Sequence, residues 1–417
     1  MGARTPGFQA TQLMQARLAR GLTRTALATA VKRSSPTVSK WEAGQQTPDP
    51  AALDALAKAL RVPRDYFLNH PFATGERPRF FRSMANATKR SRERIAQHLL
   101  WLQRISHDLQ TWVDLPAPTV PDLGGGDVQR LQDGDIEDAA ARVREQWRLW
   151  RAPIPDLLLV MENAGIVVGR CAFSAPSIDG VSHWSLADDR PYVLLSADKR
   201  TAVRSRFDAA HELGHLVLHR QVDQSALTHR DEFKELENQA HRFASAFLMP
   251  ADGFVNELPE ISLEAFRTLK PRWGVSIGAM IYRCKDLGLI TEEHAGRLFK
   301  YISARGWVRA EPEDERLTLE QPRLLERSIR LLLTQGGFSV EQLLAQLRLH
   351  PKDIEALAGL PAGLLGKRGA SVALLPLPRL KTDAEGKTGA APAGPPGIAP
   401  EVRAEVVAFP GREESAD

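Results

Sequence analysis

The sequence predicts a mainly α-helical protein with a small β-sheet, an α+β fold divided among several domains. A chain of 417 residues is too long for one compact hydrophobic core. Its apolar residues, 43% of the total, recur mostly at helical spacing. Three short runs, Ile166–Val168, Val181–Ser185 and Tyr192–Leu195, suit strands. These observations favour helical domains around one small sheet.

Composition and charge restrict the class of protein. No run approaches the roughly 18 apolar residues of a membrane span, and the N-terminus lacks the apolar core of a signal peptide. Cys171 and Cys284 give no disulfide framework, which is typical of a reducing cytoplasm, and two buried thiols are favoured over a metal pair. Up to Trp112 there are 18 Lys and Arg against 7 Asp and Glu, so the front end carries +11 and the remainder −7. A basic front end predicts contact with a polyanion.

Residues 1–70 have the pattern of a small helical bundle. Thr23 suits the cap of a short helix, and Pro36 lies in the first turn of the next one, where its missing N–H costs nothing. Gly21 and Gly44 are stop signals. The expected helices are one that ends near Arg20, Arg24–Ala30, one from Ser34 or Ser35 to Glu42, Ala51–Leu60 and Arg64–Leu68. Two short helices joined by a tight turn within such a bundle predict a helix-turn-helix DNA-binding unit.

The stretch from Leu22 to Leu60 closely resembles the Cro/C1-type (Xre) domain. The resemblance implies that Ser35–Trp41 is the recognition helix. Lys32 occupies a turn position where that family often has Gly, which predicts left-handed backbone strain. The residues expected at the DNA are Ser35, Thr37 and Lys40 in the groove and Thr23 and Arg24 near the phosphates. The alternative is a bundle with a solvated basic face, and pairing into a homodimer is left open.

Residues 71–135 are expected to form a connector. A long, basic, amphipathic helix is predicted over Arg82–Val113. Its cluster Lys89–Arg92 is interpreted as a solvated face, with phosphate contact as the alternative. Leu115–Gly134 is rich in Pro and Gly, which indicates a loop.

The body, residues 136–310, is organised around a helix that contains H-E-x-x-H. His211 and His215 are four positions apart, on one helical face, so two imidazoles can bind one metal ion. Glu212 is the next residue round and can reach a water on that metal. This is the arrangement of a zinc hydrolase. Ahead of the three strands, whose edge can pair with an extended substrate, the expected helices are Ile136–Trp150 and Asp156–Asn163.

A catalytic zinc ion uses three protein ligands and a water, so a third ligand must come from elsewhere. The apolar positions of Phe233–Pro250 have helical spacing. Glu237 falls on the same side as Ala240 and Ala244, small residues that allow close approach to the first helix. A Glu on a second helix completes the ligand set of the thermolysin class.

Further polar residues are candidates for supporting roles. His219, one turn beyond His215, is an alternative ligand, although a hydrogen bond or a helix cap is favoured. Asp208 and Glu235 are candidates for carboxylates that support the ligands, with solvated charges equally expected. His183 and Tyr192 are guesses for a donor to the charge that develops on a peptide carbonyl.

HELGH followed by E-x-x-A-x-x-F-A-x-x-x-L-M-P resembles the ImmA/IrrE family of zincin-like metallopeptidases, many of which carry an Xre domain in front. The resemblance covers residues 1 to about 310 and implies one Zn²⁺ ion, with Mn²⁺ as the alternative. The residues implied in the reaction are the ligands His211, His215 and Glu237 and the base Glu212. Gln239 and His241 replace the second Glu and the Asn of the family's usual segment, which alters the surroundings of the ligands.

The C-terminal part alternates helical patterns with Gly breaks, which predicts three or four small helices as an appendage. Beyond Lys381 the composition is that of a disordered tail. The expected domains are 1–70 (helix-turn-helix), 71–135 (connector), 136–310 (metallopeptidase), 311–380 (small helical domain) and 381–417 (tail).

Together these patterns predict a bacterial, cytoplasmic regulator that binds double-stranded DNA and has a zinc endopeptidase domain. Its expected protein substrate is a helix-turn-helix repressor or a similar regulator, cleaved in a stress or mobile-element response. The alternative is a non-proteolytic regulator, or an antitoxin-like protein, whose zinc domain senses metal or a partner.

Overall fold

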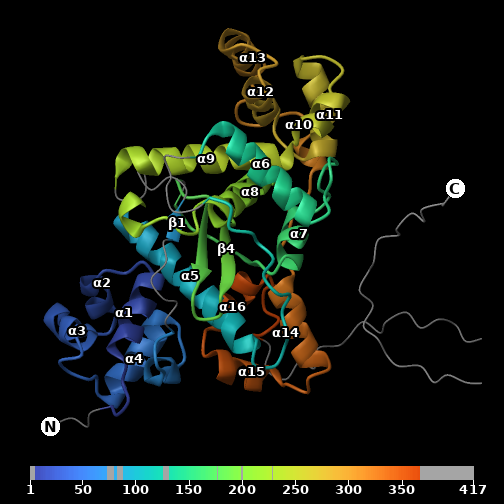
Figure 1. The fold of residues 1–417 in the computed structure, drawn as a ribbon. Coiled ribbons are helices and arrows are strands. Elements are labelled where there is room, and N and C mark those ends of the chain that lie inside the picture. Colours follow the sequence, from blue (N-terminus) through green and yellow to red (C-terminus); the bar gives the residue numbers. More distant parts are fainter. Residues whose placement is uncertain are drawn as a thin grey trace, which may run out of the picture. The chain divides into compact units, whose positions relative to one another are not determined.

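The structure is a computed structural model that describes residues 5–72, 79–81, 88–124, 131–175, 177–198, 201–227 and 229–366. In these ranges the chain is mainly helical, with sixteen α-helices and a four-stranded sheet, which confirms the predicted fold class (Figure 1). All of them belong to one compact unit, Met1–Ala370. The predicted disordered tail, 381–417, lies outside the described residues. Among the described helices, none combines the length and the apolar character that a membrane crossing requires.

The N-terminal helices form the predicted bundle. They are α1 (Ala10–Ala19), α2 (Arg24–Ala30), α3 (Ser35–Glu42), α4 (Pro50–Leu60) and the 3-10 helix η1 (Arg64–Leu68). Thr23 caps α2 by accepting from the N–H of Ala26 at 3.0 Å, and Ser34 caps α3 by accepting from the N–H of Thr37 at 3.3 Å. Lys32, between them, has φ +53°, so the expected left-handed strain is present and costs roughly 1–2 kcal/mol.

The sheet has the order β1-β3-β4-β2. Its strands are β1 (Arg79–Phe81), β2 (Val167–Cys171), β3 (Gly180–Ser185) and β4 (Arg190–Ser196). β3 pairs antiparallel with both β1 and β4, and β2 pairs parallel with β4. The three predicted strands are confirmed with longer bounds. Strand β1, which comes from the connector, was not predicted.

Several helices begin or end at other residues than the sequence predicted. In the bundle, α4 begins at Pro50, one residue before the predicted start. The larger differences are in α5 (Lys89–Leu109), α6 (Asp133–Gln146) and α7 (Leu157–Asn163). The predicted start of α5, Arg82, lies outside the described residues. Thr88 has extended backbone and caps α5 by accepting from the N–H of Ser91 at 3.1 Å, so the helix begins at Lys89.

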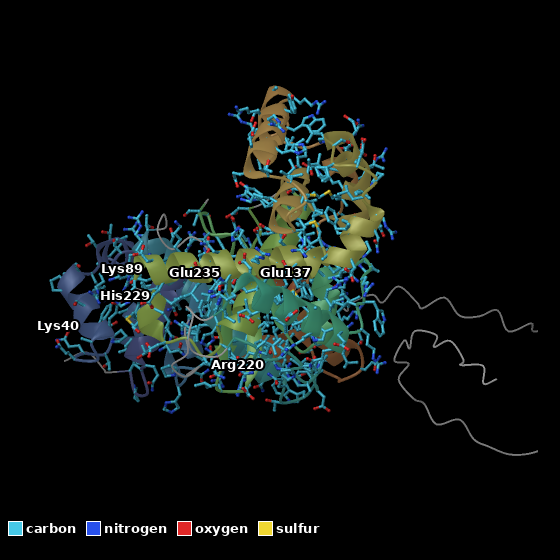
Figure 2. All side chains as sticks on the ribbon, turned by 45° about the horizontal axis from the view of Figure 1, so that its top comes forward. Lys40, Lys89, Glu137, Arg220, His229 and Glu235 are labelled. Atoms are coloured by element: carbon cyan, nitrogen blue, oxygen red, sulfur yellow. The ribbon has the colours of Figure 1, made fainter. Side chains whose placement is uncertain are left out.

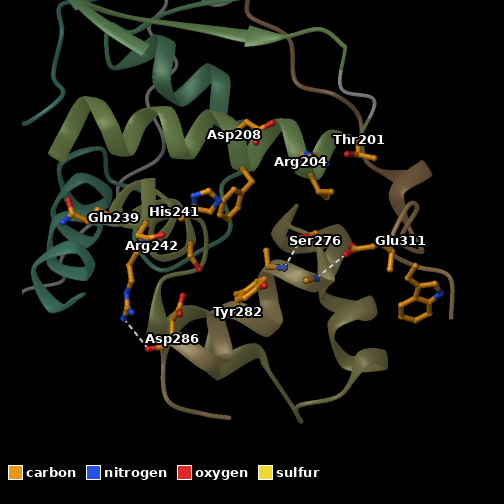
Figure 3. A pocket seen from close by; sticks show the side chains of 18 of the residues that line it. Thr201, Arg204, Asp208, Gln239, His241, Arg242, Ser276, Tyr282, Asp286 and Glu311 are labelled. Atoms are coloured by element: carbon orange, nitrogen blue, oxygen red, sulfur yellow. Dashed lines mark hydrogen bonds between the residues drawn. The ribbon is translucent and has the colours of Figure 1, made fainter. Parts of the chain in front are cut away.

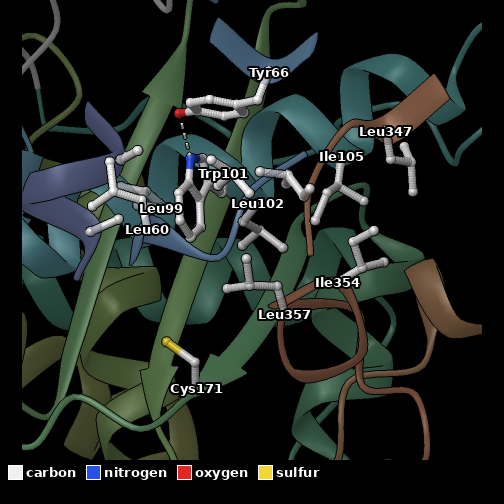
Figure 4. Packing of buried hydrophobic residues seen from close by; sticks show 14 of the residues in the cluster. Leu60, Tyr66, Leu99, Trp101, Leu102, Ile105, Cys171, Leu347, Ile354 and Leu357 are labelled. Carbon is white, nitrogen blue, oxygen red and sulfur yellow. Dashed lines mark hydrogen bonds between the residues drawn. The ribbon is translucent and has the colours of Figure 1, made fainter. Parts of the chain in front are cut away.

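The two faces of the sheet pack against different helices. On one face, Trp184 and Val193 share a core with α8 (Ala202–Leu218) and α9 (Arg230–Leu248). On the other, Val181 and Tyr192 share a core with α5 and with the C-terminal helices. Figure 4 shows part of this core, in which Leu102 of α5 lies near Leu357. The remaining helices on the α8 side are α10 (Ala251–Glu257), α11 (Leu263–Trp273), α12 (Ile277–Asp286) and α13 (Glu292–Ala304).

The C-terminal appendage packs against both the sheet and the N-terminal bundle. Its helices are α14 (Leu324–Thr334), α15 (Val340–Leu347) and α16 (Pro351–Ala358), within the predicted number. Arg20, which follows the last residue of α1, makes a bidentate ion pair with Asp353 of α16, at 2.8 and 2.5 Å. Its guanidinium lies 5.1 Å from the ring centre of Trp101. The bundle, α5, one sheet face and the appendage therefore share one core.

A histidine on α5 makes the stability of this shared core dependent on pH. The Nδ1 atom of His98 lies 3.6 Å from the Sγ atom of Cys171, and its ring lies 5.7 Å from that of Trp101. Burial lowers the pKa of His98 to about 4. The unfolded chain takes up this proton as pH falls through about 6.5, while the folded chain does not until about 4, so stability is lost on acidification.

We expect His98→Gln to remove this contribution. Between pH 6.5 and 4 the wild type should lose about 1.4 kcal/mol of unfolding free energy per pH unit more than the variant. Urea unfolding at several pH values measures the difference. Parallel curves for the two proteins would contradict the expectation.

Candidate metal centre

Helices α8 and α9 approach closely because small residues meet between them. A Cβ atom on Gly214 would lie 3.2 Å from the Cα of Ala240 and 3.1 Å from the Cδ1 of Phe243. Every residue from Asp208 to His219 is buried. The polar side chains of this stretch therefore face other protein groups and not bulk water.

The structure brings His211, His215 and Glu237 together. The Nε2 atoms of the two histidines are 3.1 Å apart. The Nε2 of His215 lies 3.3 Å from one carboxylate oxygen of Glu237, and the Nε2 of His211 lies 3.6 Å from the other. Ligands at about 2.05 Å from a tetrahedral ion are about 3.3 Å from each other, so these three side chains fit a zinc ion.

The protonation states of the cluster also suit a metal. Burial lowers the pKa of His211 well below its usual value, and burial lowers the pKa of His219 to about 3. Burial alone would raise the pKa of Glu237, but contacts with His211 and His215 outweigh it and hold that pKa below its usual range. Neutral imidazoles and an ionised carboxylate are the forms that bind metal.

A chain of hydrogen bonds orients His215 from behind. Its Nδ1 lies 2.9 Å from the Nδ1 of His219, whose Nε2 lies 3.0 Å from the Oε1 of Gln239. The amide nitrogen of Gln239 donates to Glu235 at 3.2 Å. One set of protons satisfies every link: His215 donates to His219, and His219 donates to Gln239. The Nε2 of His215 then carries a lone pair directed at the cluster.

His219 is thus a hydrogen-bond partner of His215, as the favoured sequence interpretation expected, and Glu237 stands at the cluster in its place. Glu235 is exposed and ends the chain of hydrogen bonds. Gln239, which departs from the family's usual segment, links His219 to Glu235. Its amide supplies both an acceptor and a donor at a position where the family's Glu supplies acceptors.

His241 flanks the cluster on the side of a large cavity. Its ring lies 4.7 Å from that of His211, edge to face, and its Nδ1 is 3.1 Å from the backbone oxygen of Glu237. The cavity, of about 790 Å³, is lined by α8, α9, α12 and the segment after α13 (Figure 3). Asp208 is buried at its wall, one turn before His211.

Glu212 lies against strand β3. A Cβ atom on Gly180 would be 2.7 Å from the Oε1 of Glu212, so the glycine provides the space that this side chain fills. Ser182, two positions on and on the same sheet face, is buried, and its hydroxyl has no hydrogen-bond partner in the described part of the chain. The sequence did not single out either residue.

The guesses for an oxyanion donor are wrong. The Nδ1 of His183 lies 2.7 Å from the amide nitrogen of Gln103 on α5, and Tyr192 donates its hydroxyl proton to Asp188 at 2.5 Å. His183 and Tyr192 are paired across β3 and β4 and lie on the α5 face, opposite the face that α8 covers. Successive side chains of a strand point to opposite faces of the sheet, so His183 lies on the face opposite to that of Gly180 and Ser182.

The predicted DNA-contacting residues all lie on or beside α2 and α3. The hydroxyls of Thr23 and Thr37 are engaged at the helix N-termini, the latter 2.8 Å from that of Ser34. Arg24 pairs with Glu42 at 2.7 Å. Ser35 is half-buried, whereas Lys40 is exposed on α3 (Figure 2).

Comparison with known families agrees with this architecture. Residues 161–285 match the family model of the IrrE N-terminal-like domain, and residues 10–66 match that of a helix-turn-helix domain. No curated protein matches the chain. The chain thus combines a DNA-binding helix-turn-helix domain with a metallopeptidase-like domain of the ImmA/IrrE group, which confirms both resemblances.

The hydrogen-bond chain gives a test of metal binding. Gln239→Leu removes the acceptor of His219 without changing the side-chain size much, so we expect zinc affinity to fall roughly 10–100-fold. Competition with a chromophoric chelator measures it. Gln239→Glu, which keeps an acceptor, is the matched control and should bind zinc like the wild type. Equal affinity in all three proteins would show that this chain does not support the ligands.

Proposed function

We propose that this protein is a DNA-binding transcriptional regulator with a zinc-dependent endopeptidase site, which cleaves a helix-turn-helix repressor or a similar regulatory protein in a stress or mobile-element response. The observation that carries the proposal is the convergence of His211, His215 and Glu237 beside Glu212, in a chain that also has a helix-turn-helix domain. A protease and a DNA-binding unit in one chain suit a regulator whose substrate is itself found at DNA.

His211, His215 and Glu237 would hold the ion. Zinc bound there would lower the pKa of a water molecule and polarise the peptide carbonyl, and Mn²⁺ is the alternative ion. Glu212 takes the proton of the attacking water and later gives it to the leaving amine. Glu212 directly follows His211 on α8, and its buried carboxylate fills the space that Gly180 leaves.

A second candidate is a regulator that binds zinc and DNA without turnover, or an antitoxin-like protein. The burial of His211 and His215, which have no exposed surface, favours it, because a substrate must reach the ion. Zinc and operator binding without hydrolysis of any peptide would support this second candidate over the first.

Cleavage of candidate repressors by the zinc-loaded protein tests the proposal. Glu212→Gln should lower the rate roughly 10²–10⁴-fold while one zinc ion stays bound, because it removes the base and no ligand. Glu237→Ala should lose the zinc. Gel electrophoresis and metal analysis measure the two effects. Cleavage by Glu212→Gln at the wild-type rate would end the endopeptidase assignment.

The DNA-binding part has its own test. Lys40→Ala should weaken binding to duplexes enriched from a random library by the wild type, by roughly 1–3 kcal/mol, because Lys40 is exposed on the recognition helix. Lys58→Ala, an exposed lysine on α4, is the charge-matched control. Fluorescence anisotropy measures both. The same loss in the two variants would indicate a nonspecific effect of charge.

A further inference from the structure

Strand β1 is added to the sheet from outside the peptidase-like domain. The family match begins at residue 161 and contains β2, β3 and β4. β1 belongs to the connector and pairs antiparallel with β3, with Phe80 opposite Ser182 and Arg79 opposite His183. It therefore covers the edge of the strand that lies against Glu212.

The side chain of Phe80 covers the metal cluster. Its ring is stacked on that of His215, with centroids 4.7 Å apart and planes 9° apart, and it lies 5.8 Å from the ring of His219. Only 3% of Phe80 is exposed. Around it lie apolar residues that follow α8 or belong to α9, namely Val222, Ala226, Leu227, Phe233 and Leu236.

The partner of Phe80 across the strands adds a second observation. Ser182 is fully buried on the same face, and its hydroxyl has no hydrogen-bond partner among the described residues. A buried hydroxyl without a partner destabilises the folded protein, so its presence calls for an explanation such as a role in binding. Beside Phe80 the hydroxyl is covered by an apolar ring, whereas an aromatic substrate side chain that carries a polar group could bond to it there.

An extended peptide binds a sheet edge through main-chain hydrogen bonds, with alternate side chains directed into pockets. We infer that residues 79–81 occupy the place of a substrate strand and keep the resting site closed. The apolar cluster around Phe80 is then the subsite that selects the substrate, an extended segment with an aromatic side chain opposite Ser182. This inference rests on the proposed peptidase function and adds its substrate class and its regulation.

Displacement of β1 is measured by peptide binding, without any cleavage. The probe is a fluorescent synthetic peptide with the sequence of residues 76–85, ERPRFFRSMA. It is titrated into zinc-loaded Glu212→Gln protein and into the same protein with Phe80→Ala. Removal of the buried ring opens the edge, so we expect the peptide to bind Phe80→Ala at least about ten-fold more tightly.

Two controls make the result specific. Phe72→Ala removes another connector aromatic, whose ring packs on His107 at 5.0 Å, and it should leave peptide affinity unchanged. A peptide that carries F80A should bind the opened protein at least about ten-fold more weakly than the native peptide. Equal binding of the native peptide to proteins with and without Phe80, or equal binding of the two peptides, would overturn the inference.

A second readout guards against a merely structural role of β1. Phe80→Ala should speed the removal of zinc by a chelator roughly ten-fold or more, while circular dichroism and the melting temperature stay close to those of Phe72→Ala. If Phe80→Ala unfolds, Phe80→Leu is used, which keeps an apolar side chain but removes the stacked ring. Unchanged chelation in a folded variant contradicts the closure. If the peptide binds as expected but no candidate repressor is cleaved, the endopeptidase proposal is rejected. The inference that residues 79–81 occupy the sheet edge is then retained.

Discussion

The close contact of α8 and α9 is the constraint on which the site depends. Gly214 has no side chain, and Ala240 opposite it has only a methyl group, so the two helices approach until Glu237 meets the two histidines. A larger side chain at either position would separate the helices and open the ligand set. The same contact buries the site, and burial holds the pKa of His211 well below its usual value. The close contact of α8 and α9 therefore sets both the positions of the ligands and the lowered pKa of His211.

The surroundings of the cluster are arranged in layers. Hydrogen bonds through His219 and Gln239 fix the orientation of one ligand from behind, and strand β3 fixes Glu212 from the front. The connector adds a third layer, because Phe80 closes the remaining side. Two of these three layers come from segments far from the H-E-x-x-H helix in sequence. A substitution in the connector, such as one at Phe80, can thus alter the surroundings of His215 without changing a metal ligand.

The connector also belongs to the core that joins the N-terminal bundle to the body. Helix α5 packs against α1, the sheet and α16, and Arg20 bridges the bundle to Asp353. Pro and Gly content predicts domain boundaries at residues 70 and 135. Such content marks breaks in helical pattern, but long-range packing decides which segments share a core.

The sequence by itself determined the local features: the capped helices at Thr23 and Ser34, the strained turn at Lys32, and the spacing of His211 and His215. These follow from rules that act within a few residues. Only the tertiary structure decided that Gln239 supports a ligand through His219, that His183 lies on the opposite sheet face, and that Phe80 covers the cluster. Those contacts depend on which face of each strand and helix meets its neighbour, and local patterns do not contain that choice.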